Sequence, residues 1–275
     1  MPQPHYVFHI EIMKFRIINL VFIFFSCGCF SQATTGIISY GEIQSLSLGA
    51  PIGQDYNAFL VFNETKSLYI TRKDSLESLN IIGQKEVRTA DGGASFAVST
   101  NKEGFQYFFD KDKDSVYSRD IGFKYVKDKA PSINWNITNE TKKIGRFTVQ
   151  KALTRFRGRN YTVWYAPQIP LPYGPWKLQG LPGIIIEAYN SDKSIFWYFK
   201  SIEYPTDRSY LLKPIYKPKE KVWITFDQFK NFLIQKYKDA VIAGRMVAEK
   251  MNIKTHPSSM ANSYIEVFDA KDEKK

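Results

Sequence analysis

Few residues in this sequence could take part in nucleophilic or metal chemistry. The chain holds three His and two Cys, against 21 Phe, 17 Tyr and 5 Trp. Two of the histidines and both cysteines fall before residue 32, so His256 is the one histidine of the remaining chain. A Ser-His-Asp or Cys-His arrangement could be built there only around His256, and zinc ordinarily takes His and Cys ligands. We therefore predict no cofactor and no metal.

Carboxylates are the remaining candidates for acid–base chemistry. Glycosidases act through a pair of Asp or Glu side chains, and Glu187, Glu203 and Asp227 are available for such a pair. Glu187 directly follows three isoleucines, which suggests that its side chain emerges from the core into a cavity. A salt bridge between Glu187 and one of the arginines is the alternative interpretation.

Two short charged runs could bind ions. Arg155, Arg157 and Arg159 occupy alternate positions. In a strand all three would project from one face and could bind a carboxylate, a phosphate or a sugar acid; the alternative is a solvated hairpin end that turns at 158–160. The run DKDKD at 110–114 resembles the start of a calcium loop. It lacks the Gly and the bidentate Glu of such a loop, so we predict a hairpin turn there.

The elements that must position these residues are mostly strands. Between residues 35 and 204, runs rich in β-branched and aromatic residues alternate with turn signals such as 63–66 and 190–193. The predicted strands span 57–62, 67–73, 94–100, 105–109, 115–119, 133–138, 146–156, 161–166, 184–189 and 194–204. This pattern predicts a mainly β (α+β) fold, built as a large curved antiparallel sheet or half-barrel with one C-terminal covering helix.

The covering helix has a clear start signal. Thr225 can cap a helix with Gln228 three residues later, which is the capping-box pattern. Apolar residues then recur at steps of three and four, so we predict a helix from 226 to about 250. The width of its apolar stripe favours packing on a sheet face; a role at a membrane surface or a partner is the alternative.

The start of the chain predicts export. Residues 13–32 contain the basic residues Lys14 and Arg16, an apolar run at 17–25 and small residues up to Ser31, the layout of a secretory signal peptide. The apolar run is far shorter than the about 20 residues of a membrane-spanning helix. We therefore predict a signal peptide at 1–31, with Met13 as the true start, and a single domain at 32–275.

Export places the mature chain in the periplasm or outside the cell, with no transmembrane span. The alternative is an outer-membrane lipoprotein in which Cys29 is the lipidated first residue. In either case the sequence provides no framework of disulfides.

One segment carries a family resemblance. Residues 180–185 read GLPGII, and upstream lie Trp135, the pair Lys151-Ala152, the pair Trp164-Tyr165 and the pair Gly174-Pro175. Together these features resemble the GLPGLI family of exported proteins from Gram-negative bacteria, with Ile in place of Leu at position 184. The resemblance implies an exported β-rich protein. It implies no reaction and transfers no catalytic residue.

Within that segment, Gly180, Leu181, Pro182 and Gly183 form the motif, and the Pro-Gly pair predicts a type II turn with a positive φ at Gly183. Four prolines and several aromatics precede it, so we expect a rigid loop that crosses over the sheet. This loop could seal one end of the core. Alternatively it forms a lip over a pocket, lined by the aromatic residues Trp164, Tyr165, Tyr173 and Trp176.

These observations predict a non-catalytic exported protein that binds a lipid or other apolar or amphipathic ligand, or an envelope partner. The net charge of +11 favours anionic envelope surfaces, and nucleic acid is not an expected partner of an exported protein. The alternatives are a carboxylate-dependent hydrolase acting on envelope glycans, with Glu187 as the residue to test, and a purely structural assembly partner.

Overall fold

The computed structural model describes residues 34–46, 50–52, 54–78, 87–88, 94–95, 100–252 and 259–268. The predicted signal peptide, both cysteines, His256 and most of the predicted strand 94–100 lie outside the described residues. From Thr35 onward the described residues belong to one compact unit, Thr35–Lys275.

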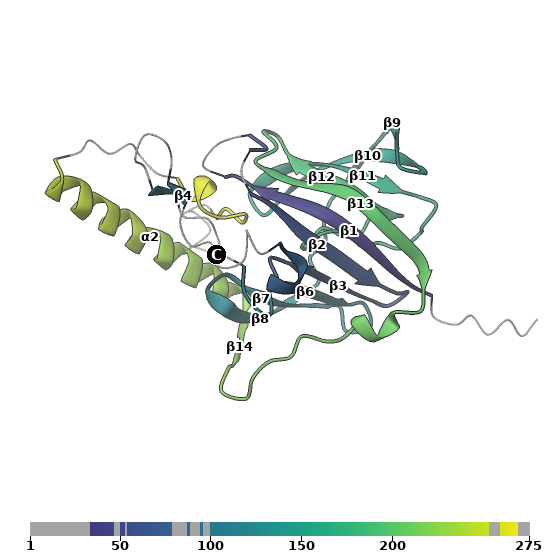
Figure 1. Ribbon diagram of the computed structural model, residues 1–275, viewed down its shortest axis with the longest axis horizontal. Helices are drawn as coiled ribbons and strands as arrows, with labels where there is room; N and C mark the ends of the chain where they lie inside the picture. The colour runs from purple at the N-terminus through teal and green to yellow at the C-terminus, as the bar shows by residue number, and fades with distance from the viewer. Residues whose placement is uncertain are drawn as a thin grey trace, which may run out of the picture. The chain divides into compact units, whose positions relative to one another are not determined.

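Strands dominate this unit (Figure 1), which confirms the predicted mainly β class. They are β1 (Thr35–Gln44), β2 (Asp55–Phe62), β3 (Lys66–Thr71), β4 (Val87–Arg88), β5 (Ala94–Ser95), β6 (Phe105–Asp110), β7 (Ser115–Asp120), β8 (Lys124–Lys129), β9 (Asn136–Ile144), β10 (Phe147–Phe156), β11 (Arg159–Ala166), β12 (Ile184–Asn190), β13 (Ile195–Thr206) and β14 (Trp223–Thr225). The helices are α2 (Phe226–Lys250) and the 3-10 turns η1 (Asp74–Leu76), η2 (Ile121–Phe123), η3 (Ser209–Leu211) and η4 (Met260–Asn262).

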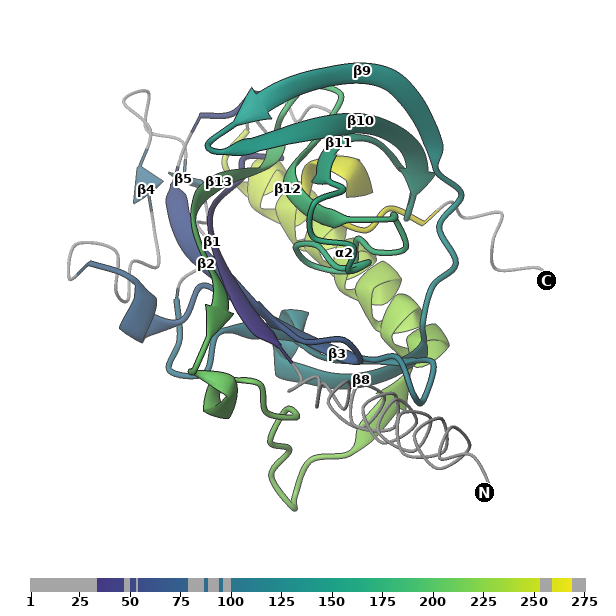
Figure 2. The same ribbon diagram turned by 90° about the vertical axis from the view of Figure 1, so that its right-hand side faces the viewer.

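Twelve of the strands form one open sheet in the order β14-β8-β7-β6-β3-β2-β1-β13-β12-β11-β10-β9. Neighbouring strands are antiparallel, except that β14 runs parallel to β8. The sheet ends at β14 and β9, so it is not closed into a barrel. Figure 2 shows β9–β12 and β2–β8 on opposite sides of the interior. Side chains from both parts form one hydrophobic core, since Leu60 of β2 and Val163 of β11 belong to the same buried cluster.

Strand β1 lies near the middle of the sheet, between β2 and β13, and it is not among the predicted strands. Glycines interrupt its sequence, TGIISYGEIQ, and glycine usually weakens a strand. At Gly41 the reason for glycine is close packing: an added Cβ would lie 2.2 Å from the ring of Tyr198 on β13. Gly41 pairs directly with Tyr198 in the ladder, so the aromatic ring crosses the strand where a side chain would stand.

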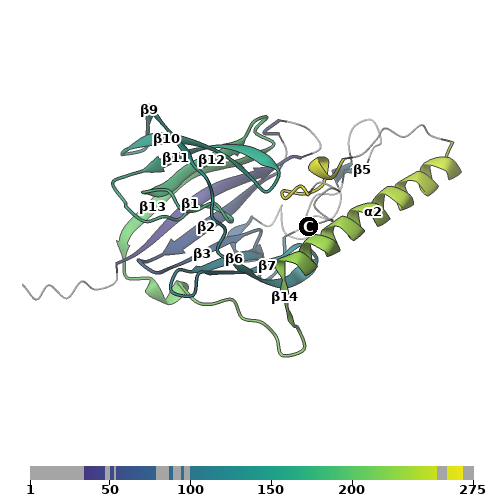
Figure 3. The same cartoon turned by 180° about the vertical axis from the view of Figure 1, so that it is seen from behind.

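The predicted C-terminal helix is confirmed with its capping box. The Thr225 hydroxyl accepts a hydrogen bond from the Gln228 backbone N–H, and the Gln228 side chain accepts one from the Thr225 N–H. The first half of α2 buries Phe229 and Leu233 against β8 and the segment 259–268. Its second half extends beyond the sheet (Figure 3) and exposes apolar side chains such as Met246. The helix therefore covers the β8–β14 end of the sheet. Among the described residues no helix is long and apolar enough to cross a membrane.

The loop between β11 and β12, residues 167–183, turns into the interior of the unit (Figure 2). Backbone hydrogen bonds from Ile184 N to Ile169 O (3.0 Å) and from Ile185 N to Tyr173 O (2.9 Å) fix it to the start of β12. The indole N–H of Trp135, a residue outside the loop, donates a hydrogen bond to the loop carbonyl of Gln179 over 2.9 Å. The loop therefore fills the core.

The predicted type II turn at Pro182-Gly183 is wrong in its detail. The glycine with a positive φ in this motif is Gly180, at +94°, and Gly183 does not adopt a positive φ. Gly183 is needed for a different reason, because an added Cβ there would lie 2.5 Å from the carbonyl oxygen of Ala166. The motif thus combines one left-handed position with one close backbone approach.

Candidate functional site

The four aromatic residues predicted to line a pocket are all buried in the main core. Tyr173 and Trp176 lie together in the loop and face a cavity between the loop and the sheet. Trp164 and Tyr165 lie on β11 and do not line it. The Tyr165 hydroxyl donates to Gln150 Oε1 over 2.8 Å, and the ring of Trp164 lies 4.4 Å from the ammonium of Lys142.

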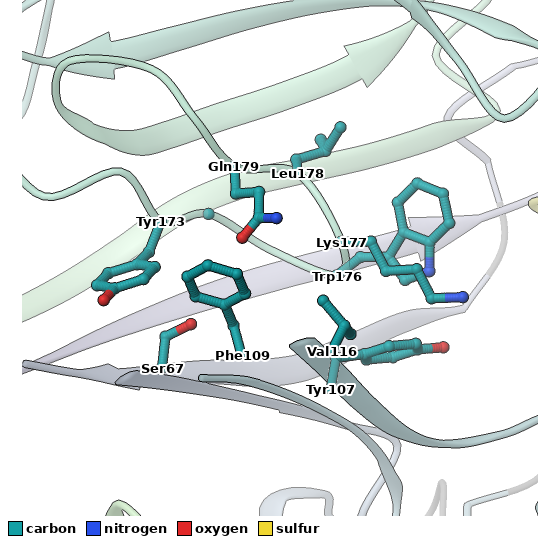
Figure 4. Close-up of a pocket in the computed structure, with 10 residues that line it drawn as sticks. Ser67, Tyr107, Phe109, Val116, Tyr173, Trp176, Lys177, Leu178 and Gln179 are labelled. Carbon is teal, nitrogen blue, oxygen red and sulfur yellow. The ribbon is translucent and has the colours of Figure 1, made fainter. Parts of the chain in front are cut away.

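The cavity beneath the loop is small. It offers about 10 Å³, at the lower limit of what one water molecule needs. Figure 4 shows that its walls come from two sources, the loop above and the strands β3, β6 and β7 below. Most of its lining is aromatic or aliphatic, and Lys177 brings an ammonium to it; the lining includes Tyr107, Phe109, Tyr173, Trp176, Lys177 and Gln179.

Lys177 is the centre of a buried charged cluster, which we call the Lys177 cluster (Asp120, Lys177 and Glu266). Its Nζ lies 2.5 Å from Glu266 Oε1 and 3.5 Å from Asp120 Oδ2. The three side chains are 2–4% exposed. Rings from three elements surround the ammonium at 5.6–5.7 Å: Tyr107 and Trp176, with Phe226 and Phe229 of α2. Burial of an ion costs free energy unless it is paired, so Lys177 needs a carboxylate counter-ion.

The charges of the Lys177 cluster do not balance when all three groups are ionised, since one ammonium faces two carboxylates. Burial raises the pKa of Asp120; the Lys177 ammonium opposes this shift, and the Glu266 carboxylate adds to it. Burial also raises the pKa of the Tyr107 hydroxyl, with Asp120 adding to the effect. Perturbed titratable groups beside a cavity mark a candidate functional site.

Three buried polar atoms near this cluster have no hydrogen-bond partner within the described parts of the chain: Tyr161 Oη, Trp176 Nε1 and Glu266 Oε2. The rings of Tyr161 and Trp176 lie 6.2 Å apart, and the Glu266 carboxylate contributes to the raised pKa of Tyr161. Figure 4 shows the Trp176 indole nitrogen and the Lys177 ammonium on the same side of the cavity. Buried polar groups are nearly always bonded, so these atoms indicate an incompletely satisfied site.

Glu266 reaches the cluster from the segment 259–268, which pairs with no strand of the sheet. Arg159 holds this segment by its backbone: Nε donates to Ile265 O (2.9 Å) and Nη2 donates to Tyr264 O (2.7 Å) and to Ala261 O. In addition the Val267 N–H donates to the carbonyl of Arg157 over 3.0 Å. The segment therefore closes the interior beside the Lys177 cluster.

The three arginines do not share one strand face, because they lie at the end of the β10–β11 hairpin. Arg155 lies exposed on β10, Arg157 and Gly158 form the turn with φ values of 49° and 78°, and Arg159 begins β11. The turn therefore centres on 157–158. Arg157 pairs with Asp128 over 2.7 Å, so two of the three guanidinium groups bind groups of the protein itself.

Glu187 forms a salt bridge, as the alternative interpretation held, but its partner is a lysine. Its Oε1 lies 2.7 Å from Lys142 Nζ, and the carboxylate side chain is 16% exposed. Of the other carboxylates considered, Glu203 pairs with Arg208 and Asp227 lies in the first turn of α2. Within the described residues no group of three or more His, Cys, Asp or Glu could hold a metal ion.

The DKDKD run forms the predicted hairpin turn. Asp110 ends β6 and pairs with Ser115 at the start of β7. Lysines neutralise two of its carboxylates: Asp110 Oδ2 lies 3.2 Å from Lys113, and Asp114 Oδ2 lies 3.6 Å from Lys129. The run thus serves as a turn between two core strands.

The chain matches no protein-family model and no curated protein. Among solved structures, two crystal forms of PNGF-II are similar to it. The form in space group P21 has 14% sequence identity and a TM-score of 0.46, and the form in space group C2 has 16% identity and a TM-score of 0.46. Each match covers 72% of this chain but only 33% and 32% of the respective PNGF-II chain. TM-scores at this level assign neither a shared fold nor a shared function.

Proposed function

We propose that this chain is an exported, non-catalytic protein that binds an amphipathic ligand in its aromatic interior. The observation that carries the proposal is the cavity beneath the loop, where aromatic rings surround the single ammonium of Lys177. Ligand sites are mostly apolar with a few placed polar groups, which matches a molecule with an apolar body and one charged head. The predicted signal peptide and the resemblance to the GLPGLI family support export.

Binding requires the interior to open, because the present space of about 10 Å³ holds no more than a water molecule. The segment 259–268 is the element that we propose to move. It contributes no strand to the sheet, whereas the loop 167–183 is bonded to the start of β12 by two backbone hydrogen bonds, at Ile184 and Ile185. The described structure is therefore the closed form of the proposed binding protein.

The test is native mass spectrometry of the protein purified from its own cell envelope, followed by lipid extraction. We expect a stoichiometric adduct that extraction identifies as an amphiphile. Lys177→Met should lose the adduct, and Lys219→Met, which changes an exposed lysine, should keep it. A native mass equal to that of the bare chain, unchanged after incubation with excess envelope lipid extract, would overturn the proposal.

A second candidate is a structural partner of an envelope complex. The filled core favours it, because the loop occupies the interior that a ligand would need. If this second role is correct, the chain should co-purify with a defined envelope complex and carry no bound small molecule. The same native spectra distinguish the two, since an intact complex without an amphiphile supports the structural role.

The hydrolase alternative stays a prediction that rests on Glu187. In the closed structure this carboxylate pairs with the Lys142 ammonium 2.7 Å away. Its test is the turnover of envelope glycans by wild-type protein and by Glu187→Gln. Turnover that disappears in the variant while the fold is retained would replace our proposal.

A further inference from the structure

The most unusual group in the interior is the carboxylate of Glu266. It comes from the segment 259–268, yet its side chain is 2% exposed and lies 2.5 Å from the Lys177 ammonium. One of its two oxygens, Oε2, has no hydrogen-bond partner within the described chain. A carboxylate can accept hydrogen bonds at both oxygens, so half of the hydrogen-bonding capacity of Glu266 is unused within the described chain.

The position that Glu266 occupies would retain strong donors if the segment lifted. Lys177 supplies an ammonium there, and in the surrounding core the Trp176 N–H and the Tyr161 O–H are donors that have no partner in the described residues and do not bond to Glu266 in the closed chain. Charged donors and oriented neutral donors together are what an anionic head requires. The aromatic walls of the adjoining cavity, Phe109 and Tyr173 among them, would contact an apolar tail.

We propose that the end of the interior around Lys177 binds the carboxylate head of an amphipathic molecule, and that Glu266 occupies this site in the closed chain. This inference rests on the proposed function and names the chemistry of its ligand. A monoanionic head fits better than a dianionic one, because Asp120 lies 3.5 Å from the same ammonium and like charges repel in a buried site.

The segment 259–268 has the features of a competing occupant. Its polar anchors are the Arg159 guanidinium, which contacts three backbone carbonyls, and Glu266 itself, while Tyr264 and Ile265 bury their side chains in the core. These contacts are separate from the sheet pairing of β10 with β11. Loss of either anchor should favour the open form, and a ligand that needs that form should then bind more tightly.

The experiment measures the affinity of the full chain for dodecanoate by titration calorimetry, with dodecanol as the probe that lacks a charged head. We expect Glu266→Gln to bind dodecanoate about tenfold or more tightly than the wild type, with a smaller gain for dodecanol. Lys177→Met added to Glu266→Gln should abolish the preference for dodecanoate. The matched control Glu203→Gln, at an exposed ion pair, should behave as the wild type.

Three results would count against the inference. Equal affinity of Glu266→Gln for dodecanoate and dodecanol would overturn the carboxylate site while leaving amphiphile binding intact. Equal dodecanoate affinity in the wild type and in Glu266→Gln would overturn the competition. If neither dodecanoate nor dodecanol bound to the wild type or to any variant, both this inference and the proposed function would be overturned.

A second variant guards against misfolding of the first. Arg159→Gln removes the anchor of the segment without touching the Lys177 cluster. We expect it to raise the affinity for dodecanoate in the same direction, and to lose the gain when combined with Lys177→Met. Far-ultraviolet circular dichroism and urea unfolding of each variant confirm that the sheet is intact.

Discussion

Two buried clusters of polar side chains lie in the same core, and they differ in how completely their atoms are paired. In the first, which we call the Glu42 cluster, Glu42 accepts hydrogen bonds from Tyr69 Oη (2.6 Å), Trp197 Nε1 (3.0 Å) and Gln44 Nε2 (2.9 Å). Arg72 lies 3.4 Å from the same carboxylate. One cation thus faces one anion and both carboxylate oxygens are bonded, although Arg72 Nε itself forms no hydrogen bond within the described chain.

The Lys177 cluster has the opposite properties. Its single ammonium faces two carboxylates, and unpartnered polar atoms remain at Tyr161, Trp176 and Glu266 within the described chain. Its members come from a strand end, a loop and the segment 259–268, whereas the members of the Glu42 cluster lie on or next to central strands. A buried carboxylate with one counter-ion and both oxygens bonded stabilises the fold, whereas a cluster with an excess of carboxylate and several unbonded polar atoms marks a place where another molecule can bind.

The largest effect should follow from breaking the charge-balanced Glu42 cluster. Glu42→Gln leaves the Arg72 guanidinium buried without a counter-ion, and loss of one partner of a buried pair costs about 3–5 kcal/mol. The free energy of unfolding of the full chain, measured with urea at neutral pH, should fall by that amount. A change no larger than that of the exposed variant Glu203→Gln would show that the Glu42 cluster contributes little.

Replacing Trp176 or Trp197 by Phe should lower the stability by different amounts, and the difference between the two variants should be of intermediate size. Trp176 and Trp197 stack on each other at 6.2 Å, so replacement by Phe removes similar contacts from each. Only Trp197 loses a hydrogen bond to a buried carboxylate, which is worth about 1.5–3 kcal/mol. Urea unfolding should therefore show Trp197→Phe to be less stable than Trp176→Phe by that difference. Equal costs would mean that the two clusters do not differ as described.

A smaller effect should follow from Glu266→Gln. Lys177 keeps Asp120 as a counter-ion in this variant, and the repulsion between the two carboxylates disappears. We expect the free energy of unfolding at neutral pH to change by less than about 1 kcal/mol. A loss as large as that of Glu42→Gln would show that Glu266 is a structural member of the core and not a replaceable occupant.

The smallest effect should be a pH dependence centred on Asp120, which faces Lys177 of the loop, Glu266 of the segment 259–268 and Tyr107 of β6. Because the folded state raises its pKa above the ordinary 3.8, Asp120 takes up a proton on folding. Its contribution is fully present below pH 3.8 and is lost as the pH rises through the raised pKa.

Glu266→Gln removes one cause of that raised pKa, so its loss of stability with rising pH should be smaller and should be complete at a lower pH. Urea midpoints of wild type, Glu266→Gln and Glu203→Gln at a series of pH values above 3.8 measure this. The wild type and Glu203→Gln should follow one curve. If Glu266→Gln follows that curve too, Glu266 does not act on Asp120.

Much of the fold could be predicted from the sequence, because its signals are local. Alternating aromatic and β-branched residues predicted most of the strands, and Thr225 with Gln228 predicted the helix start. Strand β1 was missed because Gly41 and the buried charge of Glu42 interrupt its apolar pattern, and their partners, Tyr198 and Arg72, lie elsewhere in the chain. The role of Gly183 was missed for the same reason, since it depends on the carbonyl of Ala166.

The site was predicted only in part. The aromatic loop pointed to Tyr173 and Trp176, which do line the cavity, but nothing pointed to the neighbouring Lys177 as a buried ion. Its two carboxylates come from a strand end and from a segment 89 residues away in the case of Glu266. Only the topology brings them together, and a lysine or glutamate in a mixed sequence predicts exposure by default.

The most direct test of the binding site observes the two indole N–H groups themselves. In ¹H,¹⁵N correlation spectra of Glu266→Gln, with the signals assigned from Trp176→Phe and Trp197→Phe, we would titrate dodecanoate. We predict that the Trp176 Nε1–H signal shifts as that donor gains an acceptor, while the Trp197 signal, already bonded to Glu42, stays in place. A Trp176 signal that does not move on saturation, or one that moves no more than that of Trp197, would contradict the account.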